Sequence, residues 1–359
     1  MGQNRNGGLP DRMLAPFEGA SSAVASFLLN GGNVEFGLSG ETGIGVDCNP
    51  GDVIFEIGSI SKVFAGILLA VMIEEGRVDP DRPLGDVIPE LAGTQAWLTP
   101  NRLATHSSGL PKLHIPYWKA LFLPTGDDPY AHFSRDDLFR WMRAWRKSSE
   151  PKADAYAYSN LGFGLLGEAL AALERAEYSD LLQDKVLDPM GLTDTSAELT
   201  YDKGKRFAQP YDAAGHPVRP WTFKAIAAAG ALRSTPRDMA RFASRVVDAI
   251  REPRTALDRA ICRSALPPGA RSTESDQVPF VQCLGWISIR RTREAAPVLF
   301  HNGGTAGMTS EIYICPQKRA AIGIFANRGV ASGFWSGLKL AFISPQRAAN
   351  DLFESLPTV

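Results

Sequence analysis

Apolar and polar positions along the chain of 359 residues follow two different patterns. Two short apolar stretches, 22–29 and 34–37, flank Asn30-Gly31-Gly32 and predict a β-hairpin, and residues 53–57 predict a third strand. Strand patterns return only late in the sequence, at 285–290, 298–301, 310–314 and 320–326. Strands at both ends with helices between them imply one sheet built from both termini.

Helical patterns occupy the region between these strands. The pattern predicts an apolar helix over residues 59–75 that ends at Gly76. Its longest apolar run, 63–73, has eleven residues, whereas a membrane-spanning helix needs roughly 20. We therefore expect a helix that is buried in the protein core. Further helices are predicted at 135–145, 161–175, 178–186, 236–250 and 334–356. The expected class is α+β, an antiparallel sheet flanked by helices. Residues 1–79 and 271–359 would form the sheet subdomain and 80–270 a helical subdomain.

Charge and cysteine content narrow the possible partners. The chain has 38 Lys and Arg residues and 39 Asp and Glu residues, a formal net charge of −1. This balance gives no electrostatic reason to expect nucleic acid or an anionic membrane as a binding partner. The four cysteines are widely scattered without a C-x-x-C pair, which argues against structural zinc. Residues 1–29 lack the pattern of a secretory signal. We therefore expect a cytoplasmic protein with reduced thiols.

A Ser-x-x-Lys pattern occurs three times, beginning at Ser59, Ser149 and Ser336. Only the first stands at a strand–glycine–helix junction, where Ser59 and Lys62, three residues apart, share one helix face. The helix N-terminus there also offers N–H groups to a developing oxyanion. The alternative is that Ser59 merely caps the helix and Lys62 is solvated.

Two further patterns occur once each. Tyr158-Ser159-Asn160 precedes a small-residue helix, and its structural interpretation is a helix cap. His301-Asn302-Gly303 follows a strand signal and precedes Gly304, and its structural interpretation is a turn. Each pattern alone is explained by structure.

Taken together, and in this order, the three patterns resemble those of the serine β-lactamase and penicillin-binding-protein superfamily, in the branch of class C β-lactamases, D-Ala-D-Ala carboxypeptidases and esterases or transacylases. Stretches 55–62, 103–111 and 229–235 support the resemblance, which spans residues 53–327. It implies a β-lactamase/transpeptidase-like fold, with the active site in the cleft between the sheet subdomain and the helical subdomain. It also implies Ser59 as the nucleophile that forms an acyl-enzyme, with Lys62 and Tyr158 sharing the acid–base duty.

The resemblance gives the other site residues roles as well. Asn160 would position Lys62 and the substrate carbonyl, and Gly304, beside Gly303, would complete the oxyanion hole with the backbone of Ser59. We expect the pKa of Lys62 to be lowered by desolvation and Tyr158 to ionise more easily than free tyrosine. Which of the two is the principal base stays open. No metal and no organic cofactor is implied.

The third motif departs from the family pattern. Many β-lactamases have Lys-Thr-Gly where this chain has His301-Asn302-Gly303, and a histidine is only partly charged near neutrality. A permanent positive charge for a carboxylate is missing, so the departure favours an esterase or acyltransferase over a β-lactamase or carboxypeptidase. The deacylating glutamate pattern of class A enzymes is absent from the sequence.

Eight aromatic residues lie within 112–145: Tyr117, Trp118, Tyr130, Phe122, Phe133, Phe139, Trp141 and Trp145. In the family this stretch borders the mouth of the active site, so Tyr117 and Trp118 are candidates for substrate binding. Core packing of a helical insertion is the equal alternative.

The expected function is therefore a serine hydrolase or acyltransferase that takes an ester, thioester or amide of a small metabolite. Relatives with this motif set act as transacylases on natural-product scaffolds, so the partners would be a small-molecule acyl donor and acceptor. The alternatives are a β-lactamase or D-Ala-D-Ala carboxypeptidase and, from another class, an inactive binding or sensor module.

Overall fold

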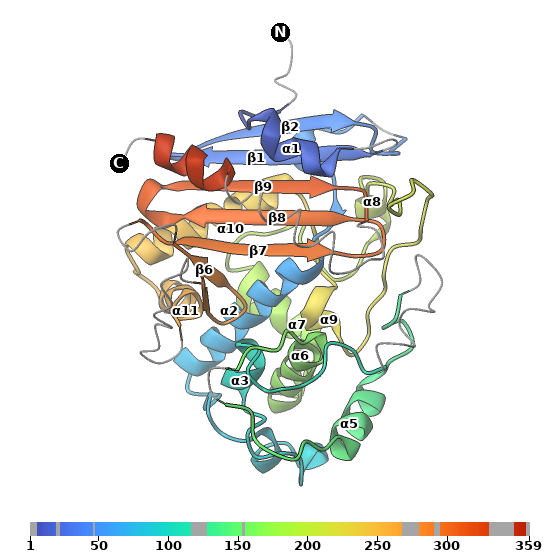
Figure 1. The fold of residues 1–359 in the computed structure, drawn as a ribbon, viewed down its shortest axis with the longest axis vertical. Helices are drawn as coiled ribbons and strands as arrows, with labels where there is room; N and C mark the ends of the chain where they lie inside the picture. The colour runs from blue at the N-terminus through green and yellow to red at the C-terminus, as the bar shows by residue number, and fades with distance from the viewer. Residues whose placement is uncertain are drawn as a thin grey trace.

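The computed structural model describes residues 6–18, 22–45, 47–115, 128–152, 155–267, 280–290, 295–329 and 348–356. Within them, a seven-stranded antiparallel sheet has the order β2-β1-β9-β8-β7-β6-β5 (Figure 1). Its strands are β1 Ala23–Asn30, β2 Asn33–Gly40, β5 Phe280–Gln282, β6 Ile287–Ile289, β7 Val298–Gly304, β8 Thr309–Cys315 and β9 Ala320–Ala326. The two ends of the chain meet where β1 pairs with β9. The predicted α+β sheet built from both termini is confirmed.

The turn between β1 and β2 shows why the predicted hairpin forms. Asn30 pairs with Asn33, which leaves Gly31 and Gly32 as a two-residue turn with φ of +59° and +100°. Such a turn requires positive φ at both positions, which glycine adopts without strain.

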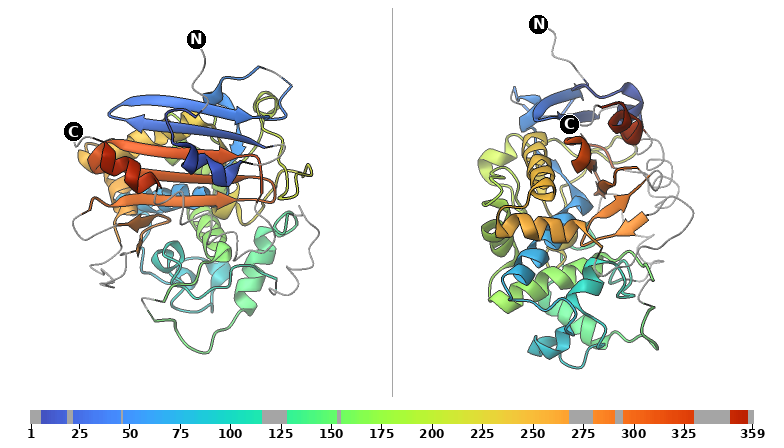
Figure 2. Two further views of the ribbon diagram at one scale, coloured as in Figure 1. Left: turned by 45° about the horizontal axis from the view of Figure 1, so that its top comes forward. Right: turned by 90° about the vertical axis from the view of Figure 1, so that its left-hand side faces the viewer.

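The sheet buries both of its faces. On one face, Tyr313, Ile322 and Ile324 pack against α1 Asp11–Leu14 and against a helix at residues 348–355, which lie across the sheet in Figure 2. On the other face, α10 Pro236–Arg251 packs against β1 and β9. The alternation of apolar side chains along the strands therefore serves two separate cores.

Helix α2, Ser61–Glu74, crosses the centre of the molecule behind β6 (Figure 1). A Cβ on its Gly66 would lie 2.0 Å from the carbonyl oxygen of Leu284, so this glycine permits close packing. The other helices are α3 Pro100–Ala104, α5 Arg135–Ala144, α6 Asn160–Glu174, α7 Tyr178–Leu182, α8 Tyr201–Gly204, α9 Ala227–Gly230 and α11 Ala256–Ala265. In the part of the chain that is described, no helix is both long and apolar enough to span a bilayer.

Several predicted elements differ from the structure. The strand expected at 53–57 shortens to β3 Phe55–Glu56, which pairs with β4 Arg233–Ser234 in a separate two-stranded sheet. The α-helix expected from Ser59 begins at Ser61, after the 3₁₀ turn Gly58–Ile60. Strand β5 and helices α1 and α11 were not predicted. Residues 334–347 of the last predicted helix lie outside the described residues, and the proposed subdomain boundaries stay a prediction.

Candidate active site

Ser59 stands in a tight turn between β3 and α2. Gly58 has a φ of +49°, and a Cβ at this position would lie 2.6 Å from the backbone nitrogen of Gly304. Any side chain here would therefore push the serine turn away from the end of β7. The glycine brings the backbone of residue 59 beside Gly304, where the sequence predicted an oxyanion hole.

The Ser59 hydroxyl is held by two side chains from different parts of the chain. Lys62 Nζ lies 2.9 Å from Ser59 Oγ, and the Tyr158 hydroxyl lies 2.7 Å from the same oxygen. Lys62 Nζ also donates to the carbonyl oxygen of Ala229 in α9 at 2.6 Å. The structure thus brings together the three residues that the sequence singled out for nucleophile and acid–base duty.

Lys62 is completely buried. Burial holds the pKa of Lys62 well below its usual value, and the charge of Lys112 acts in the same direction. A lowered pKa favours the neutral amine, whose lone pair can accept a proton from Ser59 Oγ. The expectation of a lowered lysine pKa agrees with this geometry.

The expectation for Tyr158 was wrong. Burial raises the pKa of Tyr158 above its usual value, and the hydrogen bond to Ser59 opposes this without reversing it. Lys62 Nζ lies over the face of the ring, 4.9 Å from its centre. Tyr158 is therefore a neutral donor in the free protein.

His106 is a residue to which the sequence analysis gave no role. It is buried and has a φ of +56°, which is rare for a residue with a side chain. Its Nδ1 accepts from the backbone N–H of Ser159 at 3.1 Å, and its ring centre lies 4.5 Å from that of Tyr158. Burial lowers the pKa of His106 far below its usual value, so the ring is neutral and supports Tyr158 by packing. Its stretch, 103–111, carried part of the family resemblance, but no local pattern reveals the positive φ.

Ser159 fixes the position of Tyr158 from the other side. Its hydroxyl caps α6 by accepting from Gly162 N at 2.8 Å and donates to the carbonyl oxygen of Pro111 at 2.7 Å. The segment that carries Tyr158 is thereby tied to residues 106–111 at two points. A helix cap and a catalytic position share this tripeptide.

Asn160 has different partners from those expected. Its Nδ2 donates to the hydroxyl of Tyr130 at 2.7 Å, whereas the hydrogen bonds of Lys62 Nζ among the described residues are to Ser59 and Ala229. No hydrogen bond joins Asn160 to Lys62 in the part of the chain that is described, and the expected positioning role of Asn160 stays a prediction. The Oδ1 of Asn160 is buried and has no hydrogen-bond partner among the described residues, so it is available to a donor that enters the site.

The third motif lies on the last residues of β7. His301 is buried, and its Nδ1 lies 2.6 Å from the carbonyl oxygen of Asn302. Burial, assisted by Lys62, lowers the pKa of His301 to about 3. The ring is therefore neutral at physiological pH, and the expectation of a partial charge was wrong. The reason is that this ring faces the interior rather than solvent.

The glycines of the third motif shape the edge of β7. A Cβ on Gly303 would lie 1.9 Å from the carbonyl oxygen of Ile57, so this position packs directly beneath the serine turn. Gly304 is exposed. Strand β6 pairs with β7 only from Val298 to Phe300, so among the described residues no strand covers that edge of residues 301–304. An extended substrate can lie along it.

Tyr117, Trp118 and Phe122 lie outside the described residues. The other aromatics of 112–145 are described. Tyr130, Phe133 and Phe139 are buried in the main core, and Tyr130 stacks on Phe223. Trp141 stacks on Trp145, with ring centres 6.4 Å apart. For these five residues the structure supports core packing.

Glu56, buried in β3, forms a network beneath the site. Its carboxylate accepts from the Thr305 hydroxyl at 2.6 Å and from the backbone N–H of Trp221 at 2.8 Å, and Arg233 lies 3.7 Å away. Glu56 is three residues before Ser59, and Thr305 directly follows Gly304. One carboxylate therefore connects the two backbone segments of the expected oxyanion hole.

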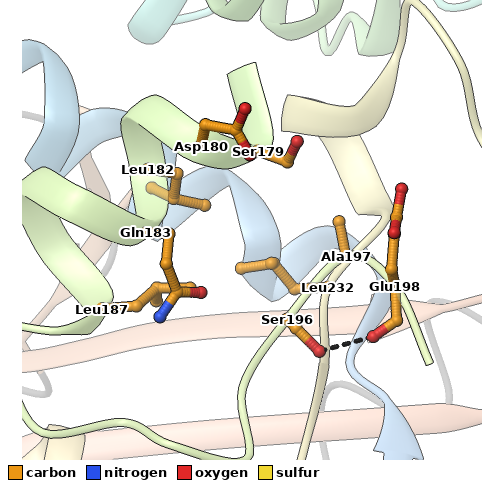
Figure 3. A pocket seen from close by; sticks show the side chains of 9 residues that line it. All are labelled: Ser179, Asp180, Leu182, Gln183, Leu187, Ser196, Ala197, Glu198 and Leu232. Carbon is orange, nitrogen blue, oxygen red and sulfur yellow. Dashed lines mark hydrogen bonds between the residues drawn. The ribbon is translucent and has the colours of Figure 1, made fainter. Parts of the chain in front are cut away.

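Figure 3 shows a separate cavity of about 170 Å³ between α7, the π-helical turn Gln183–Leu187 and residues 196–198. Its lining includes apolar Leu182, Leu187 and Leu232 together with the exposed carboxylates of Asp180 and Glu198. The side chains around Ser59 do not line it. This cavity lies outside the catalytic arrangement.

Comparisons with known proteins agree on one family. A family model described as Beta-lactamase matches residues 11–335. The D-alanyl-D-alanine-carboxypeptidase/endopeptidase AmpH of Escherichia coli (strain K12) is 26% identical over 333 residues, which cover 88% of this chain and 81% of that protein. A β-lactamase of Providencia stuartii is 30% identical over 167 residues, 46% of this chain, and the match spans 40% of that relative's length. Among solved structures, a class C β-lactamase from Rhodobacter sphaeroides has a TM-score of 0.74 at 22% identity, covering 96% of this chain and 100% of that one.

Proposed function

We propose an activity for this chain on the premise that it belongs to the β-lactamase family and is a serine hydrolase of that family. The proposed activity is cleavage of an ester, thioester or amide of a small metabolite through an acyl-Ser59 intermediate, with release to water or transfer to an alcohol or amine. The observation that carries it is the pair of contacts on Ser59 Oγ, from a fully buried Lys62 and from Tyr158.

Acylation follows from these contacts. Neutral Lys62 accepts the proton of Ser59 Oγ as the oxygen forms a bond to the substrate carbonyl carbon. The negative charge that develops on the carbonyl oxygen faces the backbone at Ser59 and Gly304. When the intermediate collapses, the bond to the leaving group breaks, and the leaving group receives a proton from Tyr158, which is replenished from the Lys62 ammonium. Lys62 is then neutral again.

Deacylation repeats these steps with a new nucleophile. Water or an acceptor alcohol or amine loses its proton to Lys62 and attacks the acyl carbon, and Ser59 Oγ leaves with a proton. The Oδ1 of Asn160, buried and without a partner among the described residues, offers an acceptor to a donor group of substrate. Tyr117 and Trp118 remain candidates for contacting the acyl group.

The neutral ring at position 301 supports an ester or acyl-transfer substrate over a β-lactam. With its pKa lowered to about 3, His301 supplies no positive charge to a carboxylate at neutral pH. The second candidate is a β-lactamase or D-Ala-D-Ala carboxypeptidase activity, which the names of the relatives favour.

Covalent labelling tests the nucleophile. A fluorophosphonate should form a bond between Ser59 Oγ and phosphorus with loss of fluoride, detected as a mass increase on the peptide that contains Ser59. The matched control is Ser149→Ala, because Ser149 begins another Ser-x-x-Lys pattern but is exposed. Ser149→Ala should label like wild type, and Ser59→Ala should not label. Labelling elsewhere, or none in wild type, would contradict the proposed acyl-enzyme.

Partitioning separates hydrolysis from transfer. An activated ester is supplied with increasing concentrations of an alcohol or amine acceptor, and the hydrolysis and transfer products are quantified. An acceptor bound in an oriented site competes with water at millimolar concentration. If transfer stays at the background rate over a broad acceptor panel, the activity is that of a hydrolase.

A further inference from the structure

His106 holds the backbone on both sides of Tyr158. The carbonyl oxygen of His106 accepts a hydrogen bond from the backbone N–H of Ala157 at 2.8 Å. The Nδ1 atom of the same residue accepts another from the backbone N–H of Ser159 at 3.1 Å. Tyr158 therefore lies between two hydrogen bonds that end on one residue, and its hydroxyl lies 2.7 Å from Ser59 Oγ.

The ring of His106 also contacts the tyrosine directly. The centres of the His106 and Tyr158 rings are 4.5 Å apart, and the ring of Phe163 in α6 lies 5.0 Å from His106 on the core side. Because Nδ1 accepts from a backbone N–H, the proton of the neutral imidazole is on Nε2. The ring therefore acts as a fixed acceptor, and its basic nitrogen is not available to take a proton from substrate.

The backbone at His106 is in a conformation that a side chain makes unfavourable. Its φ of +56° lies in the left-handed region, which glycine adopts without strain, as Gly109 does at +74°. A glycine at position 106 would keep the carbonyl oxygen for Ala157 but would offer no acceptor to Ser159. Despite the strain, the histidine adds that acceptor and the ring beside Tyr158. Strain of this kind is found at functional sites, where the surrounding structure maintains it.

We propose that His106 is a positioning residue for Tyr158: the two hydrogen bonds that His106 accepts hold the tyrosine hydroxyl where it protonates the leaving group. This proposal rests on the proposed acyl-Ser59 activity and deepens it by naming the residue that sets the geometry of its proton donor. His106 exchanges no proton in the reaction. Its effect is geometric, and a misplacement of a catalytic group by about 1 Å can cost on the order of 100-fold in rate.

Three variants at position 106 separate the acceptor from the rest of the side chain. His106→Gly removes the acceptor and relieves the left-handed strain, whereas His106→Phe removes the acceptor but fills the space of the ring. His106→Asn is the conservative variant, because asparagine tolerates a positive φ and its Oδ1 can accept from the N–H of Ser159. The melting temperature of each variant, followed by circular dichroism, shows that it is folded.

The measured quantity is kcat/KM for phenyl butyrate and for 4-nitrophenyl butyrate. Phenolate is the more basic leaving group, so cleavage of the phenyl ester depends more strongly on a proton donor. His106→Gly and His106→Phe should therefore lower kcat/KM about tenfold more for the phenyl ester than for the 4-nitrophenyl ester, and His106→Asn should recover most of the loss. If His106→Gly does not fold, the comparison is made with His106→Phe.

A second background distinguishes positioning from general damage to the site. In Tyr158→Phe no hydroxyl is left to position, so the same changes at His106 should lower kcat/KM by less than about twofold. The matched control is Arg175→Gly, which relieves a left-handed φ of +54° at the opposite end of α6 and should leave both kcat/KM values unchanged.

Equal losses for the two esters, equal losses in the wild-type and Tyr158→Phe backgrounds, or a His106→Asn variant as impaired as His106→Phe would each overturn the proposal. A different result marks failure of the proposed function. If wild type shows no Ser59-dependent turnover of either ester, or if Tyr158→Phe cleaves phenyl butyrate as fast as wild type, the proposed function has failed, and the positioning role of His106 fails with it.

Discussion

Replacing Thr305 by valine tests whether the buried carboxylate network positions the expected oxyanion hole. The Thr305 hydroxyl donates to Glu56 at 2.6 Å and accepts from the backbone N–H of Met308 at 3.2 Å. Valine preserves the branched shape but provides neither interaction. Because Thr305 is buried next to Gly304, the change removes the connection between the end of β7 and the segment that leads to Ser59.

The expected magnitudes follow from these contacts. A hydrogen bond to a charged group contributes roughly 1.5–3 kcal/mol, so Thr305→Val should lower the free energy of unfolding by about 2 kcal/mol. Loss of one oxyanion donor costs about 100-fold or more in kcat, and a displaced donor retains part of its effect. We therefore expect kcat for a 4-nitrophenyl ester to fall about tenfold, with a smaller change in KM.

Urea denaturation and steady-state kinetics measure the two effects separately. Thr305→Ser keeps the hydroxyl and should recover most of the kcat. The matched control is Thr195→Val, because Thr195 is also buried and its hydroxyl donates to the carboxylate of Asp238 at 2.9 Å. This control should lose stability but retain kcat. If Thr305→Val is destabilised with normal kcat, or if Thr195→Val loses kcat equally, the network does not position Gly304.

Three further predictions concern titratable groups. Lys62→Ala and Tyr158→Phe should each reduce kcat strongly, and the double variant should lose less than the product of the two effects, because both act on one proton; simple multiplication of the effects in ester kinetics would contradict this. His301→Gln should leave the shape of the pH–rate profile between pH 5 and 9 unchanged, because the pKa of His301 is about 3; loss of a limb near pH 6–7 would show that the ring titrates there. Burial raises the pKa of Glu311, whose carboxyl group contacts the Tyr313 hydroxyl, to about 8. The protonated Glu311 side chain therefore contributes fully to folding stability below the unfolded-state pKa, and this contribution is lost as the pH rises through about 8. Glu311→Gln should therefore raise the melting temperature relative to wild type at pH 9 but not at pH 5, and an equal effect at both pH values would contradict it.

Local sequence signals were sufficient where an element depends on its own residues. The Gly31-Gly32 turn determines the register of the first hairpin, and the short apolar stretches 310–314 and 320–326 identify two buried strands. Helix α2 is recognisable as a core helix from its apolar run of eleven residues, 63–73. The two-residue strands β3 and β4 are too short for any periodicity, so their pairing depends on contacts that the sequence does not display.

Some features of the site were also predictable from local sequence, whereas others depend on contacts between distant segments. Spacing along a helix places Lys62 near Ser59, and this was predictable from sequence. The 3₁₀ turn at Ser59 was not predictable, because the turn packs at Gly58 against Gly304, which is distant along the chain. The ionisation of Tyr158 was also mispredicted, since its pKa depends on burial by residues from several elements.

The titratable groups around Ser59 share one electrostatic property. Burial lowers the pKa values of Lys62, His106 and His301 and raises that of Tyr158, so each of these groups favours its neutral form. Charge therefore arises at the reacting atoms only when Ser59 transfers its proton, and the resulting ammonium and oxyanion attract each other in a poorly solvated site.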